Sequence, residues 1–289
     1  MSAARHVYLS VRRHDGRGIA RWTLHKRDNQ GQWDGNVSEH GLHRQSVGLR
    51  CFWRELRQRL SRRRSIPSVA KARVKHLLHE TNLSHWFAQA GGAANYPKEH
   101  FENLVSAEDI ALIKAMGFDH VRLSVNPQPM WRHNEADAIP TEYLGYLDAA
   151  VKMILDKNLA VVIDIHPEGD FKKALSSDAS VEQFAYFWRG LAKHYSSWDP
   201  DRVFFESLNE SEMRDHYRWN GILARLAVAI REGAAQQTII VEGARWADDD
   251  DLMFMEPPRD ANVIYNFHFY EPHLFTHQGA TWGRVIGTI

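Results

Sequence analysis

The sequence predicts an α/β protein with a parallel sheet, and three observations support this prediction. From about residue 80 onward, short apolar runs alternate with segments whose apolar residues recur at helical spacing. The runs within 119–125 and 159–165 are rich in β-branched or apolar residues, and the second is apolar almost throughout, which is typical of a strand buried on both faces. Polar side chains follow the carboxyl ends of several runs. Because catalytic groups gather at that end of the strands in a (β/α)8 barrel, the sequence predicts this barrel.

The predicted strands and helices alternate as right-handed βαβ units require. Ser106 precedes the first clear helix and Gly117 ends it. A capping box of Ser180 and Gln183 is expected to begin a later helix, and Gly233 to end the one after it. No G-x-G-x-x-G turn follows an early strand, which argues against a dinucleotide-binding sheet. The six strands are expected near 81–86, 119–125, 159–165, 202–208, 238–242 and 262–269, and the helices near 107–117, 143–158, 184–195 and 217–233.

Charge is unevenly distributed along the chain. Residues 1–80 contain 18 Lys and Arg against 6 Asp and Glu, whereas residues 81–289 contain 18 against 30. This break predicts a basic N-terminal extension over residues 1–78, with a possible hairpin turn at Asp15-Gly16, and a partial barrel over 79–289. Clustered arginines can neutralise nucleic-acid phosphates. Base-reading motifs are absent from the sequence, so a solvated extension is the favoured interpretation and no nucleic-acid partner is expected.

Composition excludes two further classes. The single cysteine, Cys51, rules out an intramolecular disulfide. No apolar run approaches the roughly 18 residues of a membrane span, and the first residues lack the roughly 7–15 apolar residues of a secretory signal. The sequence therefore predicts a globular protein with no membrane partner, and it leaves the localisation open.

Four motifs in one order resemble glycoside hydrolase family 5, the cellulase family of retaining β-glycosidases. They are "HVRLSV", "VVIDIHP", "LNE" and "NFHFYEPHLFTHQGATWG", and the resemblance covers about residues 80–289. The resemblance implies that Glu210 is the catalytic acid/base, which must keep its proton near neutral pH through a raised pKa. It also implies that Asn209 binds the sugar 2-hydroxyl, that Arg122 supports the nucleophile and that Tyr270 hydrogen-bonds it. His166 and His268 are expected to line the cleft, with Trp86, Trp246 and Trp282 as candidate platforms for glucose rings.

Other acidic and histidine clusters have simpler interpretations. Glu206, upstream of the Asn-Glu pair, is expected to be a barrel-interior or a salt-bridged acid rather than a catalyst. The aspartates at 248–251 suggest calcium, but adjacent acids usually form a solvated loop or a helix start. His268, His273 and His277 match no standard zinc spacing, so a loop near a cleft explains them better. Neither a metal nor a cofactor is therefore expected.

The sequence departs from the family pattern at two places. Ser211 replaces the usual proline after Asn-Glu. The family's nucleophilic glutamate and its cleft tryptophan follow a seventh and an eighth strand, and this sequence reaches Ile289 soon after the sixth, while Glu271 follows the wrong strand. We expect two open sheet edges, poor stability and at most trace glycosidase activity from the 289 residues alone.

The resemblance implies an endo-β-1,4-glucanase that hydrolyses cellulose-like polysaccharides by a retaining double displacement. An inactive barrel fragment with residual glycan binding is the alternative interpretation. A basic nucleic-acid-binding module fused to a barrel remnant is a third.

Overall fold

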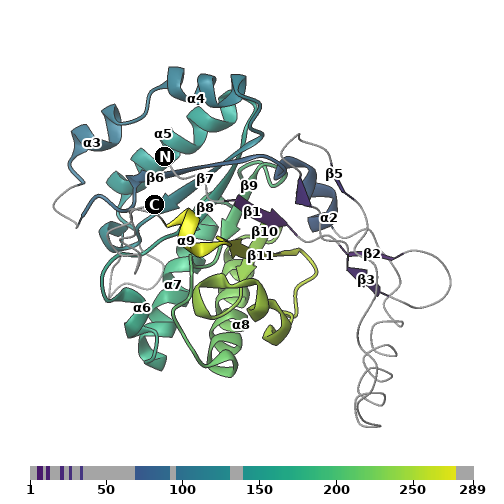
Figure 1. Cartoon of the computed structure of the whole chain (residues 1–289). Coiled ribbons are helices and arrows are strands. Elements are labelled where there is room, and N and C mark those ends of the chain that lie inside the picture. The colour runs from purple at the N-terminus through teal and green to yellow at the C-terminus, as the bar shows by residue number, and fades with distance from the viewer. Residues whose placement is uncertain are drawn as a thin grey trace, which may run out of the picture.

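The structure is a computed structural model that describes residues 69–91, 96–130 and 139–277, together with the backbone of five short strands between residues 5 and 34. Six parallel strands form the sheet, in the order in which they occur in the chain, and helices cover its outer face (Figure 1). The strands are β6 (Glu80–Phe87), β7 (His120–Val125), β8 (Ala160–Ile165), β9 (Val203–Glu206), β10 (Thr238–Glu242) and β11 (Val263–Phe269). All six were predicted from the sequence, and they make an incomplete barrel.

Helices connect the strands as the sequence predicts. The principal ones are α4 (Ala107–Ala115), α5 (Thr141–Asp156), α7 (Asp178–Tyr195) and α8 (His216–Gly233). Shorter helices are α3 (Lys98–Asn103), α6 (Phe171–Ala174), α9 (His273–Thr276), η3 (Gln128–Met130), η4 (Arg245–Ala247) and η5 (Asp249–Phe254). Within the described part of the chain, no helix combines the length and the apolar character needed to cross a membrane.

The helix ends test the predicted caps. Ser106 caps α4 in a capping box with Asp109, and Gly117 follows that helix with a φ of +90°, a conformation that favours glycine. The predicted capping box of Ser180 and Gln183 is wrong. Helix α7 already begins at Asp178 after Ser177, so Ser180 lies inside its first turn.

Side chains of the strands alternate between two cores. Outward-facing residues such as Ile163, Phe205 and Val241 pack with the helices in the main core. Inward-facing apolar residues fill the amino-terminal end of the barrel, together with Leu77, which precedes β6. This second cluster comprises Ala70, Leu77, Ala160, Val162, Phe204, Ile240 and Ile264. Nearer the carboxyl ends, the inward positions carry charged and polar residues. The interior is therefore apolar at the amino-terminal ends of the strands and polar at their carboxyl ends, where the sequence predicts the active site.

Residues before the predicted barrel boundary also contribute. Helix α2 (Val69–Arg73) and the 3-10 helix η1 (Val74–His76) lie at the amino-terminal end of the barrel. The Arg73 guanidinium donates to Asp201 Oδ1 over 2.8 Å and to Thr238 Oγ1 over 3.1 Å. Barrel packing thus starts before residue 79.

The N-terminal segment supplies one edge strand. Strand β1 (Arg5–Tyr8) pairs antiparallel with β11, so the edge expected to be open after the sixth strand is covered. Strands β2 (Val11–Arg13) and β3 (Ala20–Trp22) also pair antiparallel, as a hairpin requires, and β4 (Lys26–Arg27) pairs with β5 (Trp33–Asp34). The turn predicted at Asp15-Gly16 lies outside the described residues.

Candidate active site

Glu210 lies just past the carboxyl end of β9, with its side chain about one quarter exposed (26%). Its backbone has a φ of +48°, in the left-handed region that a non-glycine residue adopts at a cost of about 1–3 kcal/mol. Two contacts hold it there. The backbone N–H donates to Glu242 Oε2 over 2.9 Å, and the carboxylate accepts a hydrogen bond from His268 Nδ1 over 2.7 Å.

The charge state of Glu210 differs from the one expected of a catalytic acid. Burial alone would raise its pKa, but the hydrogen bond and the positive charge of His268 outweigh burial, and the pKa is lowered. Burial likewise disfavours the charged form of His268, yet the carboxylates of Glu242 and Glu210 raise its pKa to about 10. The raised pKa predicted for Glu210 is therefore wrong for this arrangement, in which the pair is carboxylate and imidazolium.

Arg122 organises the buried side of the site from the middle of β7. Its Nε and Nη2 atoms donate to the two carboxylate oxygens of Glu206 over 2.8 and 2.6 Å. Nη2 also donates to Asn209 Oδ1 over 2.9 Å, and Nη1 lies 3.1 Å from Asp164 Oδ2. The prediction that Glu206 is a salt-bridged acid of the barrel interior is confirmed.

Three buried carboxylates share two cations here. Asp164 and Glu206 lie against Arg122, and Glu242 lies against His268. Burial and the negative charges of Asp164 and Glu242 therefore raise the pKa of Glu206, although Arg122 opposes the shift.

His166 lies at the end of β8 beside Asn209. Its Nδ1 atom lies 3.1 Å from Asp164 Oδ2, and its Nε2 atom lies 3.1 Å from the Gln89 amide nitrogen and 3.4 Å from that of Asn209. An amide nitrogen only donates, so Nε2 accepts and Nδ1 carries the proton that is donated to Asp164. The two contacts of Asn209, with Arg122 and His166, fix the orientation of its amide.

Tyr270 follows β11 at the same end of the barrel. Its ring lies edge-on to His268, with 6.3 Å between the ring centroids. Burial and the nearby Glu210 carboxylate raise the pKa of Tyr270 to about 12, so the hydroxyl keeps its proton near neutral pH. The residues predicted from the four motifs are thus held at one end of the sheet by neighbouring strands.

Comparison with known proteins shows the family of the chain. The cellulase family, glycosyl hydrolase family 5, matches residues 84–286. The chain belongs to glycosyl hydrolase family 5. Endoglucanase C of Acetivibrio thermocellus is 33% identical over 210 residues, which are 70% of this chain and 60% of that protein. Cellodextrinase A of Ruminococcus flavefaciens has the same identity and coverage. The chain therefore spans about 60% of the length of these curated relatives.

Solved structures agree with the family assignment. Cel5A of Thermotoga maritima in complex with cellobiose matches with a TM-score of 0.65 and 27% identity, over 74% of this chain and 67% of that one. The complex of the same enzyme with mannotriose matches with a TM-score of 0.65 and 26% identity. The incomplete family 5 barrel predicted from the sequence is confirmed.

The three tryptophans proposed as sugar platforms have different outcomes. Trp86 is 3% exposed and its indole donates to the Phe101 carbonyl over 2.9 Å, so its assignment as a platform is wrong. Trp246 is 49% exposed, and its backbone N–H donates to the Ser211 carbonyl over 2.6 Å, which joins the loops after β9 and β10. Trp282 lies outside the described residues.

The acidic and histidine clusters give no free ligand set in the described residues. Asp248 caps η5 and Asp251 is buried against Arg245, so the expected helix start explains this run. Glu206, Glu242 and His268 place one ligand atom each within 4.8 Å of one another, but these atoms already bind Arg122, Asn266 and each other. His273 and His277 stack with 3.8 Å between their ring centroids, and neither belongs to that group of three.

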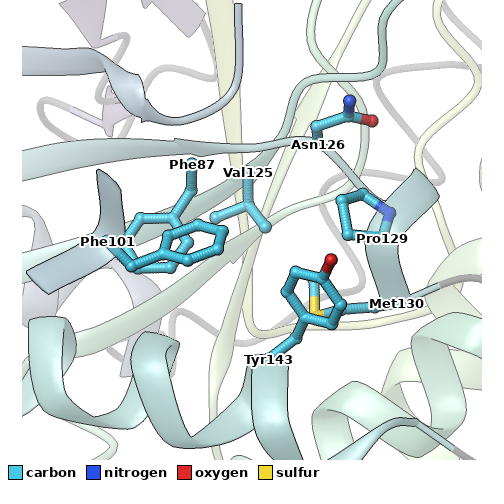
Figure 2. A pocket seen from close by; sticks show the side chains of 7 residues that line it. All are labelled: Phe87, Phe101, Val125, Asn126, Pro129, Met130 and Tyr143. Carbon is cyan, nitrogen blue, oxygen red and sulfur yellow. The ribbon is translucent and has the colours of Figure 1, made fainter. Parts of the chain in front are cut away.

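A small apolar pocket lies beside the carboxyl end of β7 (Figure 2). Its lining comes from β6, β7, α3, η3 and α5 and consists of Phe87, Phe101, Val125, Asn126, Pro129, Met130 and Tyr143. Figure 2 shows the Phe101 ring and the Tyr143 side chain on either side of Val125. None of the residues predicted for catalysis or sugar binding lines it, so this pocket is not assigned to the reaction.

Sequence reasoning missed two acidic members of the site, Asp164 and Glu242. Asp164 lies within the run "VVIDI", and Glu242 ends the apolar run "TIIVE", two residues after the inward-facing Ile240. An acid at the inward phase of a barrel strand, at its carboxyl end, was the available signal.

Proposed function

We propose that the chain acts on β-1,4-glucans as an endo-acting glycoside hydrolase of the retaining type, with Glu210 as the acid/base. One observation carries the proposal: the Glu210 carboxylate is placed at the carboxyl end of a barrel strand and held by His268 beside Asn209 and Tyr270. The names of the relatives, Endoglucanase C and Cellodextrinase A, support a β-glucan substrate.

In the proposed reaction, Glu210 protonates the leaving glycosidic oxygen while a second carboxylate attacks the anomeric carbon. The ionised Glu210 then removes a proton from water, which displaces that carboxylate. Asn209 binds the 2-hydroxyl of the sugar, and the Tyr270 hydroxyl donates a hydrogen bond to the attacking carboxylate, as the family resemblance implies. Arg122 acts on the same carboxylate by its positive charge, and Trp246 provides an exposed ring for sugar stacking.

The attacking carboxylate also explains the pKa that Glu210 needs. In a retaining site the two carboxyl groups lie about 5 Å apart, and a like charge at that distance raises the pKa of the acid. The charge of the attacking carboxylate would therefore oppose the lowering of the Glu210 pKa by His268. The family resemblance puts the attacking glutamate after a later strand than β11, and residues 278–289 contain no aspartate or glutamate.

Glycan binding without turnover is a second candidate function, and a specific observation favours it. Among the described residues, the carboxylates nearest Glu210 are already engaged: Glu206 binds Arg122, and Glu242 binds His268 and the Glu210 backbone. Neither is free to attack a sugar, so we expect slow turnover where only these carboxylates are available.

Reducing-sugar release from carboxymethylcellulose separates the two candidates. If the chain is a hydrolase, Glu210→Gln should lower release by about 10²–10⁴-fold, because an amide cannot donate the required proton. Glu212→Gln is a matched control two residues away, with a half-exposed side chain, and should retain the wild-type rate. Binding of cellotetraose with no release from the wild type would instead support the second candidate, and neither binding nor release would refute both.

A further inference from the structure

Glu242 is a fully buried carboxylate with no role assigned by the family motifs. It ends β10, where Ile239 and Val241 face the helices and Ile240 faces the barrel interior. The strand alternation therefore directs Glu242 inward, at the end of the barrel where Glu210 lies.

Both oxygens of Glu242 contact the acid/base group or its partner. Oε2 accepts the backbone N–H of Glu210 over 2.9 Å, at the residue whose φ is +48°. Oε1 lies 2.8 Å from His268 Nε2, and the other ring nitrogen of His268 binds the Glu210 carboxylate over 2.7 Å. One buried side chain thus contacts Glu210 directly through its backbone and indirectly through its carboxylate.

The position of Glu242 is itself closely determined. Its backbone carbonyl accepts a hydrogen bond from the buried indole of Trp219 over 2.9 Å, and its Oε1 accepts one from Asn266 over 2.9 Å. Asn266 is its register neighbour on β11. The next residue is Gly243, where an added Cβ would lie 2.8 Å from the Asp251 Cβ, so the chain after Glu242 has no room for a side chain. A carboxylate held this firmly can position a neighbour.

We propose that Glu242 is the positioning residue of the acid/base: it holds the Glu210 backbone in its left-handed conformation and holds His268 as the cation that orients the Glu210 carboxylate. This inference rests on the proposed role of Glu210 where it concerns catalysis. The contacts that couple Glu242 to His268 and to Glu210 are present whether or not the chain hydrolyses a substrate.

The charges around the two partners agree with this role. His268 faces Glu242 on β10, Glu210 after β9 and, as the opposing charge, Arg122 on β7; the two carboxylates raise the pKa of His268 to about 10 although the ring is buried. Glu210 faces His268 and Glu242, and Lys172 of α6 is a more distant cation. Since the effect of His268 on the pKa of Glu210 exceeds that of Glu242, loss of the imidazolium charge should raise the pKa of Glu210.

The test replaces Glu242 by glutamine in the 289-residue chain and follows the His268 ring by ¹⁵N NMR as a function of pH. Glutamine keeps the shape and can accept the Glu210 N–H, but it carries no charge. We expect the His268 pKa to fall by at least about 1 unit, the effect of one close opposite charge. The exposed Glu256→Gln is the matched control and should leave the His268 titration unchanged.

A second variant separates charge from reach. Glu242→Asp keeps the negative charge on a shorter side chain, so we expect the His268 pKa to stay well above its usual value while the amide resonance of Glu210 shifts. A purely structural role would move the unfolding midpoint in both variants and leave the His268 pKa as in the wild type, and that result would overturn the proposal. If the NMR shifts appear but no reducing sugar is released by the wild type, the positioning inference stands and the proposed hydrolysis fails.

Discussion

Replacing Arg122 by methionine is the perturbation whose cost the structure defines best. The side chain is 3% exposed and donates to both oxygens of Glu206 and to Asn209, over 2.6–2.9 Å, and lies 3.1 Å from Asp164. Methionine fills part of the volume but leaves two buried carboxylates without their guanidinium partner. Removing one partner of a buried ion pair typically costs about 3–5 kcal/mol.

That cost is large on the scale of a folded domain, whose free energy of unfolding is about 5–15 kcal/mol. The assay is urea unfolding followed by circular dichroism at 222 nm (chosen for the helices), with the free energy extrapolated to zero urea. Arg225→Met is the matched control, because Arg225 makes the same two-bond pair with Glu182 over 2.8 and 2.7 Å but at the surface. With side chains 29% and 46% exposed, that surface pair should contribute about 1 kcal/mol or less.

The double variant Arg122→Met, Glu206→Gln should have a higher free energy of unfolding than Arg122→Met alone, since the second change removes one of the uncompensated charges. A loss of less than about 1 kcal/mol in Arg122→Met, equal to that of the surface control, would refute the reasoning that Arg122 neutralises the barrel interior.

Three further predictions follow from individual contacts. Folding raises the pKa of His268 from 6.5 to about 10. The stabilisation that this shift provides should be complete below about pH 6.5 and should be lost as the pH rises through about 10. Over this range the urea midpoint should therefore fall less in His268→Gln than in the wild type. Arg73→Ala should lower the free energy of unfolding by about 2 kcal/mol, because it removes charged hydrogen bonds under the barrel, and an unchanged urea midpoint would contradict this. A 2-fluoro cellobioside should label neither Glu206 nor Glu242, since both are engaged in buried pairs, and peptide mass spectrometry of the treated chain would detect either adduct.

Much of the fold follows from the sequence for physical reasons that local pattern captures. Strands such as Ala160–Ile165 are apolar apart from Asp164 because they are buried on both faces, and helices such as Thr141–Asp156 show their buried side in their own periodicity. The cap at Ser106 was predictable because its partner, Asp109, is three residues away. The capping box predicted at Ser180 and Gln183 failed because α7 already begins at Asp178.

Features that depend on distant partners were not predictable in this way. The β1 strand pairs with β11, some 260 residues later by chain position, and nothing local indicates that pairing. Trp86 lies near the carboxyl end of β6, but its ring is buried and its indole donates to the Phe101 carbonyl, 15 residues later. The lowered pKa of Glu210 depends on the charge of His268. The sequence predicts that His268 lines the cleft, but it indicates neither this charge nor the contact between His268 and Glu242.

The measurement that tests the central claim most directly compares two substrates with the wild type and Glu210→Gln. On carboxymethylcellulose, whose leaving group needs a proton, the variant should lose about 10²–10⁴-fold in rate. On 2,4-dinitrophenyl β-cellobioside, whose leaving group departs without acid assistance, kcat/KM reports the first step and should be far less affected. Equal rates for the two proteins on carboxymethylcellulose, or equal losses on both substrates, would contradict the assignment of Glu210 as the acid/base.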